Sequence, residues 1–288
     1  MIYTQNNYLR ASGSGTNFKV EIDPPTRHNL DYHKSTLEVA KEIHDRKQGK
    51  LYLMYSGGVD SEYALNVFLS LGIEITPVIV KLTPNYNDHD VKYAFEFCRL
   101  KKLNPIIIDL DFDWFVKSGK IIDVAKFSDC GAYQIPSTFH ALEQLDGTIV
   151  MGSHGPPHLT KVGDQWLVDE LEAVHSVLKY FDRAGIHGYP FMLSYTNEQY
   201  FSFLQDPCMQ ALADNKIPGK LGNNSSKGLI YNRISGFNMP IRKKYTGYEN
   251  IENQTIFSHE NIQWFLTEGQ QWYGKHYDTY TNLMSRVI

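Results

Sequence analysis

One short stretch of the chain combines residue types that bind phosphate and metal: Ser56, Gly57, Gly58, Val59, Asp60 and Ser61. The two glycines let the backbone come close to a ligand, and free backbone N–H groups at the start of a following helix hold anions. The two serines add hydroxyl donors. The carboxylate of Asp60 repels phosphate unless a cation lies between them, and Mg²⁺ is such a cation. We therefore expect a site for a metal-bound polyphosphate, with Asp60 as the metal ligand.

The same residues allow a simpler alternative, a Gly-Gly turn in which Asp60 only caps the next helix. Two other nucleotide-binding motifs are absent from the sequence. There is no Walker A pattern, and the Gly-x-Gly-x-x-Gly fingerprint fails because Gly13 and Gly15 are followed by Phe18 at the last position. Residues 56–61 are thus the candidate phosphate loop.

The elements that must position this loop follow from the spacing of apolar residues. Leu51–Tyr55 is an apolar run that ends at the glycines, and apolar residues then recur at helical intervals to Leu71. Further short apolar runs predict three more strands: Ile75–Leu82, Ile106–Ile108 and Thr148–Met151. Continuous apolar strands separated by helices indicate an α/β fold with a doubly wound parallel sheet. Ligands of such sheets bind beyond the carboxyl ends of the strands, where the loop lies.

The chain divides into three predicted parts. Residues 1–34 are expected to be irregular, with one short strand at Phe18–Ile22. Residues 35–155 hold the sheet, and Ser35 and Glu38 have the spacing of a capping box that opens its first helix. Residues 156–288 predict a smaller, mostly helical lobe over the substrate. Helices are expected over 35–46, from Asn87, and over 138–145, 167–182, 198–213 and 260–272.

Ser-Gly-Gly-x-Asp-Ser after an apolar strand resembles the PP-loop of the N-type ATP pyrophosphatases, which include asparagine, GMP and NAD synthetases and several RNA-modifying enzymes. All five fixed positions are present, and the resemblance extends from Leu51 to Ser153. It implies the adenine nucleotide alpha-hydrolase-like fold. It also implies that ATP and Mg²⁺ bind here, that a substrate oxygen attacks the α-phosphate, and that pyrophosphate leaves while AMP is transferred.

The resemblance also implies roles for single residues. Those that would hold pyrophosphate are Ser56, Gly57, Gly58 and Ser61. Asp60 would position the metal and act in catalysis, and the end of the second strand, with Val80 and Lys81, would flank the adenine. Gly152 and Ser153 stand where the synthetases of this family place a glycine-rich loop near the adenylated substrate. Their acidic pair is missing from this loop, and an ordinary turn is an equal alternative.

A second feature is a basic segment between Asn215 and Tyr248 that contains no Asp or Glu. Its cations are Lys216, Lys220, Lys227, Arg233, Arg242, Lys243 and Lys244. Folded over the loop, this basic segment would neutralise the triphosphate, with Lys227 as the catalytic candidate and Arg242 and Lys243 as alternative phosphate ligands. Two other interpretations stay open. One is a solvated basic surface; the other is an RNA-binding patch in which the stacking rings are Tyr231, Phe237 and Tyr245.

Three functions fit these features. The first is an adenylating ligase that is asparagine synthetase-like but has no glutaminase. In asparagine synthetases an N-terminal cysteine generates ammonia from glutamine, whereas here Ile2 follows Met1. We therefore expect ammonia that is free, delivered by a partner protein or replaced by another amine. The second is modification of a nucleic-acid base, as in tRNA, through the same adenylation. The net charge of −4 and the lack of a Cys-x-x-Cys pair argue against it. The third is a nucleotide-binding module without catalysis.

Composition sets the remaining expectations. The 288 residues, 42% of them hydrophobic, predict a compact globular chain. Cys98, Cys130 and Cys208 are too widely spaced for a redox or zinc pair, so buried thiols are expected. No apolar run approaches the roughly 20 residues that span a bilayer, and no signal segment is evident. We therefore expect a cytoplasmic protein without a membrane partner, acting on a small molecule or nucleobase; a homodimer stays open.

Overall fold

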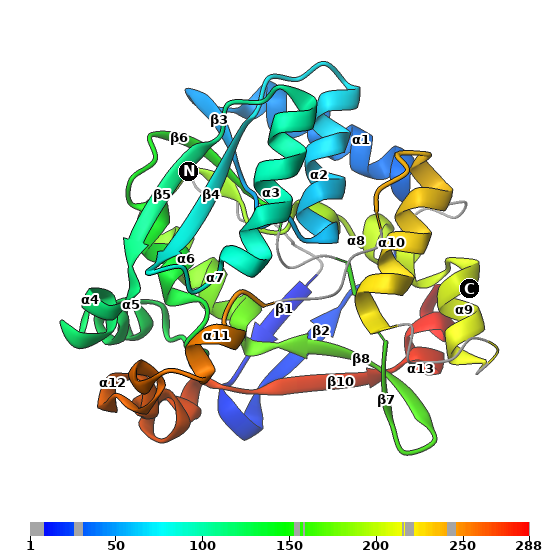
Figure 1. Cartoon of the computed structure of the whole chain (residues 1–288). Coiled ribbons are helices and arrows are strands. Elements are labelled where there is room, and N and C mark those ends of the chain that lie inside the picture. Colours follow the sequence, from blue (N-terminus) through cyan, green and yellow to red (C-terminus); the bar gives the residue numbers. More distant parts are fainter. Residues whose placement is uncertain are drawn as a thin grey trace.

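The computed structural model describes residues 9–25, 31–152, 156–157, 159–214, 216, 222–240 and 246–287. Its centre is a five-stranded sheet in which all strands are parallel, in the order β5-β4-β3-β6-β9 (Figure 1). The strands are β3 (Lys50–Met54), β4 (Thr76–Thr83), β5 (Ile106–Asp111), β6 (Gly147–Met151) and β9 (Gly188–Tyr189). The expected α/β class, with a parallel sheet flanked by helices, is confirmed.

Helices precede and connect these strands. The first group consists of α1 (Tyr32–Arg46), α2 (Val59–Ser70) and α3 (Asp88–Lys101), which Figure 1 shows together over the upper part of the molecule. The second group is α4 (Phe112–Lys117), α5 (Lys120–Ser128), α6 (Pro136–Leu142) and α7 (Glu172–Arg183). The chain runs outward from β3 through β4 to β5 and then returns to β6 on the other side of β3. The strand order therefore reverses between β3 and β6.

Burial along the strands explains why they form a sheet core. Leu53, Ile79 and Val150 on β3, β4 and β6 are all 0% exposed. The edge strand β5 alternates instead, since Ile108 is buried while Ile107 is 48% exposed. An edge strand with one solvated face needs only alternate apolar residues, so the run of three isoleucines is not buried throughout.

The start of the chain is more regular than predicted. A hairpin joins two antiparallel strands, β1 (Leu9–Ser12) and β2 (Lys19–Ile22). The capping box predicted at Ser35 and Glu38 is wrong, because α1 already begins at Tyr32. Asp31 is its N-cap, and the Asp31 carboxylate accepts a hydrogen bond at 2.9 Å from a backbone N–H three residues on. Asp31 offers the acceptor that a helix start requires one turn before Ser35.

Strand pairing replaces the helix predicted over 167–182. The first part of that segment is β8 (Gln165–Leu171), and only the second part is helical, as α7. β8 is the central strand of an antiparallel sheet with β7 (Leu159–Val162) and β10 (Lys275–Thr279). Pairing with β10, more than 100 residues later in the sequence, is a tertiary interaction that local periodicity does not report. The region after residue 155 also gives β9 to the central sheet.

Prolines and short turns divide the other helices predicted there. The helix expected over 198–213 is two helices, α8 (Asn197–Leu204) and α9 (Pro207–Ala213), because a proline cannot continue the hydrogen-bond ladder. The segment 260–272 is the short α12 (Glu260–Gln263) followed by 3-10 turns. The remaining helices are α10 (Gly222–Ser235), α11 (Glu249–Glu252) and α13 (Tyr280–Met284).

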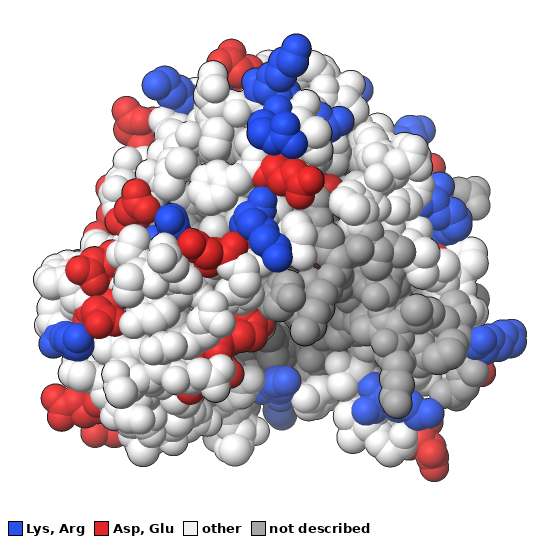
Figure 2. Space-filling view, viewed as in Figure 1, with Lys and Arg blue, Asp and Glu red and all other residues white. Residues whose placement is uncertain are grey.

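Surface charge and thiols complete the picture. Figure 2 shows Lys and Arg interspersed with Asp and Glu over the described part of the face in view. Cys98 and Cys130 are buried, as expected, and Cys208 is half-buried. Within the described residues, no helix has both the length and the apolar character needed to cross a bilayer.

Candidate functional site

The candidate phosphate loop lies where the strand order reverses. β3 ends at Met54 and α2 begins at Val59, so the loop occupies the carboxyl end of the central strand. The end of β6 lies against it: a Cβ placed on Gly152 would be 2.6 Å from Ser61 Cα. Only a glycine fits between these two segments, and ligands of doubly wound sheets bind at this position.

Contacts within the loop fix its shape. Gly57 has a φ of +81°, and a Cβ there would lie 2.7 Å from Ala94 N, so a side chain is excluded on both counts. Ser56 Oγ accepts a hydrogen bond from Gly58 N–H at 3.2 Å, and the Ser61 hydroxyl donates to Gly58 O at 3.0 Å. Gly58 is the N-cap of α2 and gives no side-chain cap to the first turn. The loop therefore offers an anion the N–H groups of a helix start.

The carboxylate of Asp60 is held by two side chains of α10. Lys227 Nζ lies 3.2 Å from Asp60 Oδ2, and Tyr231 OH donates to Asp60 Oδ1 at 2.6 Å. Lys227 is only 8% exposed, and the Asp60 side chain is 21% exposed, so solvent screens this ion pair weakly. Lys227 and Tyr231 are one helical turn apart and thus lie on one face of α10. The structure brings two residues singled out from the sequence, Asp60 and Lys227, into contact across 167 positions.

A stack of aromatic rings anchors Tyr231. Its ring lies 4.1 Å from that of Tyr63 on α2, with 5° between the planes, and 6.3 Å from that of Tyr32 on α1. All three rings are buried. Burial, followed by the charge of Asp60, raises the pKa of Tyr231 well above its usual value. At neutral pH the phenol is therefore protonated and donates to the carboxylate.

The described cations of the basic segment are all paired with acids that lie outside it. Besides Lys227, Lys216 Nζ lies 2.9 Å from Asp214, and Arg233 contacts Asp206. Four other predicted cations fall outside the described residues: Lys220, Arg242, Lys243 and Lys244. The RNA-binding interpretation needed exposed stacking rings, and for Tyr231 it is wrong because this ring is 0% exposed.

A hollow of about 620 Å³, counting its opening to solvent, lies beside the loop at the carboxyl ends of β3 and β4. Ser56 lines it on the loop side, and Val78, Val80 and Leu82 line its apolar wall. Sites for small molecules are concave, and their walls are mainly apolar with a few polar groups. Val80, expected to flank adenine, is thus at the hollow. Lys81 is not among its lining residues, because alternate strand residues point to opposite faces and Lys81 lies 3.6 Å from Asp88 instead.

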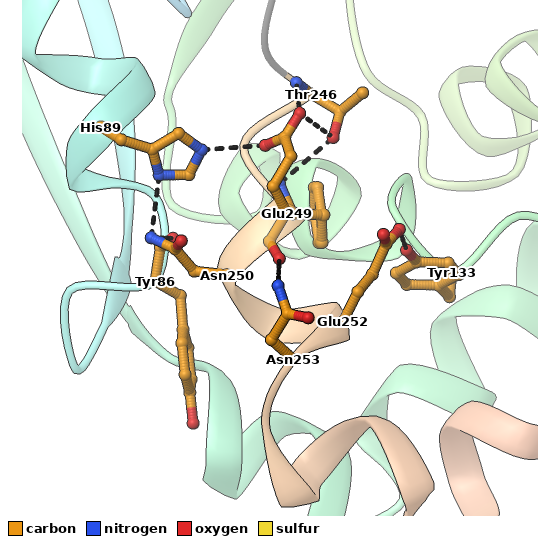
Figure 3. A network of polar contacts seen from close by, with 9 residues as sticks. Tyr86, His89, Tyr133, Thr246, Glu249, Asn250, Glu252 and Asn253 are labelled. Atoms are coloured by element: carbon orange, nitrogen blue, oxygen red, sulfur yellow. Dashed lines mark hydrogen bonds and ion pairs between the residues drawn. The ribbon is translucent and has the colours of Figure 1, made fainter.

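The outer wall of the hollow is the segment Thr246–Tyr248, which a polar network holds in place (Figure 3). Glu249 Oε2 lies 2.8 Å from His89 Nε2 on α3, and Glu249 Oε1 accepts a hydrogen bond from Thr246 N–H at 2.7 Å. Asn250 donates to a backbone oxygen in the turn before α3 at 3.1 Å. These contacts tie the end of the basic segment to the first turn of α3.

Several residues of this site escape sequence reasoning. Ser153, predicted to lie near the substrate, falls outside the described residues, whereas Gly152 meets the loop. Asn87 was expected only as the start of a helix, and Asp90 and the wall at Thr246–Tyr248 were not singled out. An acid in the first turn of a helix is common because it complements the helix dipole, so the sequence of α3 gives no signal that Asp90 faces a hollow.

The sequence predicts a metal site at Asp60, and Asp60 is the one carboxylate of the loop at residues 56–61. Among the described residues, no group of three or more His, Cys, Asp and Glu side chains is arranged to hold a metal ion. Mg²⁺ that accompanies a nucleotide uses one or two carboxylates together with phosphate and water oxygens. A carboxylate has about four lone-pair positions, and Lys227 and Tyr231 engage one oxygen each. Asp60 therefore fits a cation that arrives with the phosphates better than a preformed metal cage.

Comparison with known proteins assigns the chain to no family. No protein-family model matches it, and no curated protein matches it significantly.

Proposed function

We propose that the protein is an ATP pyrophosphatase that adenylates a substrate oxygen, with AMP and pyrophosphate as products and an amide or C–N bond as the outcome. One observation carries the proposal: the loop at the reversal point of the parallel sheet is paired with a buried lysine from a distant helix. An acid that merely caps a helix needs no such partner. The resemblance of residues 56–61 to the PP-loop supports the same chemistry.

Each part of the site has a role in this proposal. N–H groups at the start of α2, with the hydroxyls of Ser56 and Ser61, donate to the β- and γ-phosphate oxygens. Lys227, at the edge of the same loop, donates charge-assisted hydrogen bonds to the departing pyrophosphate. The apolar wall of the hollow, with Val78 and Val80, takes the adenine. The α-phosphate then lies between the hollow and the loop.

Asp60 links the lysine to the metal in this scheme. Mg²⁺ bound with the nucleotide neutralises charge that develops on the phosphates. Asp60 would hold that ion on its remaining lone pairs, while the protonated phenol of Tyr231 fixes the direction of the carboxylate. Before a nucleotide binds, Lys227 offsets the charge of Asp60 at a distance of 3.2 Å. The side chains therefore orient the nucleotide and neutralise the charge of its phosphates, and the substrate supplies the nucleophile.

The thiols favour nitrogen over sulfur as the second nucleophile. Sulfur transfer by the chain needs a reactive thiolate, which a lowered pKa provides. Burial instead raises the pKa of Cys98 to about 11, and burial also raises the pKa of Cys208. Cys130 is 0% exposed and its thiol donates to a backbone oxygen. We therefore propose an amine or ammonia as the group that displaces AMP.

The decisive experiment measures which bond of ATP is broken. The protein is incubated with Mg²⁺, ATP labelled in the α-phosphate, and pools of carboxylates and amines, and the labelled products are separated. We expect labelled AMP together with pyrophosphate, and labelled ADP would contradict the proposal. Asp60→Asn should abolish AMP formation. Asp123→Asn, which alters an exposed acid on α5, is the matched control and should leave it unchanged.

A further inference from the structure

The two carboxylate oxygens of Asp60 have partners of different kinds. Tyr231 OH donates to Oδ1 at 2.6 Å, and Lys227 Nζ lies 3.2 Å from Oδ2. The phenol is neutral at neutral pH, because burial raises the pKa of Tyr231 well above its usual value. Among the ion pairs of the described residues, Asp60 takes part in the one with Lys227 alone. The lysine is therefore the cationic partner of this carboxylate.

The surroundings of Asp60 disfavour a metal ion that arrives by itself. Asp60 lies in the first turn of α2, where the N–H groups of the helix start carry partial positive charge. The ammonium group of Lys227 is a second positive group, and its side chain is only 10% exposed. A free cation is repelled by both groups, whereas a phosphate is attracted by both. The site is thus arranged for an anion first, although it contains the carboxylate that a metal ion needs.

We propose that Lys227 is an exchangeable counter-ion of Asp60. In the free protein it keeps divalent cations away from the carboxylate, and it leaves the carboxylate to a cation that arrives bound to phosphate. A lysine suits this exchange because its flexible stem lets three N–H donors turn from a carboxylate to a phosphate. The inference rests on the proposed function for the identity of the phosphate ligand. Exchange at Asp60 can nevertheless be measured with a metal ion alone.

Terbium binding to the protein without nucleotide tests the first half of the exchange. Tb³⁺ binds hard oxygen ligands, as Mg²⁺ does, and it luminesces when a nearby tyrosine transfers excitation energy to it. Tyr231, hydrogen-bonded to Asp60, is such a tyrosine. Lys227→Gln should bind Tb³⁺ roughly 10-fold more tightly than the wild type or better, because a positive charge 3.2 Å from the ligand oxygen is lost. Lys227→Arg keeps the charge and should bind Tb³⁺ as weakly as the wild type.

Control variants locate the terbium signal. Adding Asp60→Asn to Lys227→Gln should abolish the gain in affinity, which separates Asp60 from other acids that lie near tyrosines. Lys216→Gln changes a lysine of the basic segment whose side chain is 72% exposed, and it should bind Tb³⁺ like the wild type. Circular dichroism establishes that each variant is folded. Equal Tb³⁺ affinity in the wild type and Lys227→Gln, or a gain that survives Asp60→Asn, would overturn the exchange and leave the proposed function standing.

Calorimetric titration with pyrophosphate, with and without Mg²⁺, tests the second half. Without Mg²⁺, Lys227 has to neutralise both Asp60 and the ligand, whereas with Mg²⁺ it has only the ligand to neutralise. The loss of pyrophosphate affinity in Lys227→Gln should therefore be larger without Mg²⁺, roughly 100-fold against roughly 10-fold. Equal losses would overturn the exchange, because a lysine that only contacts phosphate is indifferent to the metal ion.

Asp60→Asn keeps the test decisive if Lys227→Gln does not fold. This variant releases Lys227 without removing it, and no carboxylate is left for the metal ion. It should bind pyrophosphate within about 3-fold with and without Mg²⁺, and a larger gain from Mg²⁺ would overturn the exchange. A wild type that binds no pyrophosphate under either condition would overturn the proposed function, while the terbium titration decides on the exchange separately.

Discussion

Lys227 and Asp60 form the interaction on which the proposed chemistry depends. Burial of a lysine that is 8% exposed carries a desolvation cost, which its partner at 3.2 Å offsets. Such a pair contributes little net stability compared with apolar packing. The ion pair instead positions the ammonium group of Lys227 beside a loop rich in N–H donors. An anion there would be bound by both.

Lys227→Gln should therefore damage catalysis, because glutamine carries no charge to place beside the loop. We expect kcat/KM for AMP formation to fall by roughly 100-fold or more, because a charge-assisted contact to the departing pyrophosphate is lost. Lys216→Gln is the matched control, since Lys216 belongs to the same basic segment but its side chain is 72% exposed. Steady-state kinetics on the two variants checks the prediction. Equal losses of kcat/KM in the two variants would show that only the overall charge of the basic segment matters for catalysis.

Asp90 makes stability depend on pH in a defined direction. Its pKa is raised by burial from the usual 3.8 to about 7, so the folded state binds more protons than the unfolded state between these values. Stability should therefore fall as pH rises from 4 through 7. Asp90→Asn removes this loss. The free energy of unfolding of the variant should exceed that of the wild type by about 2 kcal/mol at pH 8 and differ little from it at pH 4. Urea denaturation at the two pH values measures it; a constant difference would contradict it.

At the scale of elements, α10 is the part that completes the loop. It contacts α2 and α1, and its Tyr231 ring packs against the Tyr63 ring of α2 and the Tyr32 ring of α1. Local helix formation does not explain this docking, since α10 has glycine, asparagine and serine in its first turn. Aromatic burial and the hydrogen bond to Asp60 supply the specificity.

Tyr231→Phe separates the hydrogen bond from the stacking. The ring contacts with Tyr63 persist, while Asp60 loses a donor at 2.6 Å. We expect a loss of about 2 kcal/mol in the free energy of unfolding, because the hydrogen bond is shielded and its acceptor is charged. Urea denaturation measures this loss, with Tyr273→Phe, a ring that is 37% exposed, as the control. An unchanged midpoint would mean that the hydrogen bond is not what docks α10.

At the scale of the whole molecule, the outer wall of the hollow joins distant parts of the chain. The segment Thr246–Tyr248 follows the basic segment, yet it is tied to α3 through His89 and Glu249 (Figure 3). Burial alone would raise the pKa of Glu249, but hydrogen bonds from Thr246 and His89 outweigh it and lower the pKa to about 2. The wall is thus secured by a group that is ionised throughout the neutral range.

The sign of this shift predicts how the wall responds to acid. A lowered pKa means that Glu249 stabilises the fold fully above pH 4.5 and that this contribution is lost as pH falls from 4.5 through 2. Glu249→Gln should cost about 1 kcal/mol at pH 6, after allowance for the screening of a side chain that is 40% exposed. The deficit should shrink by pH 3. Thermal melts from pH 6 to pH 3 check this, with the exposed Glu38→Gln as the control.

Local structure was predictable wherever it rests on neighbouring residues. The apolar runs at Leu51–Tyr55 and Ile75–Leu82 became β3 and β4, within one residue at each end. The strand now called β8 was mistaken for part of a helix because its stability comes from pairing with β7 and β10. Two-sided pairing is invisible in a single window of sequence.

The sequence by itself determined the loop at 56–61, because its donors, its glycines and its acid are contiguous and begin a helix after a strand. It also determined the alternation of strands and helices that produces a parallel sheet. Only the tertiary structure decided that Lys227, among seven cations of the basic segment, meets Asp60, and that Asp90 faces a hollow. Both depend on how elements far apart in the chain dock, and docking follows from burial of the aromatic stack and of the sheet, which no local pattern encodes.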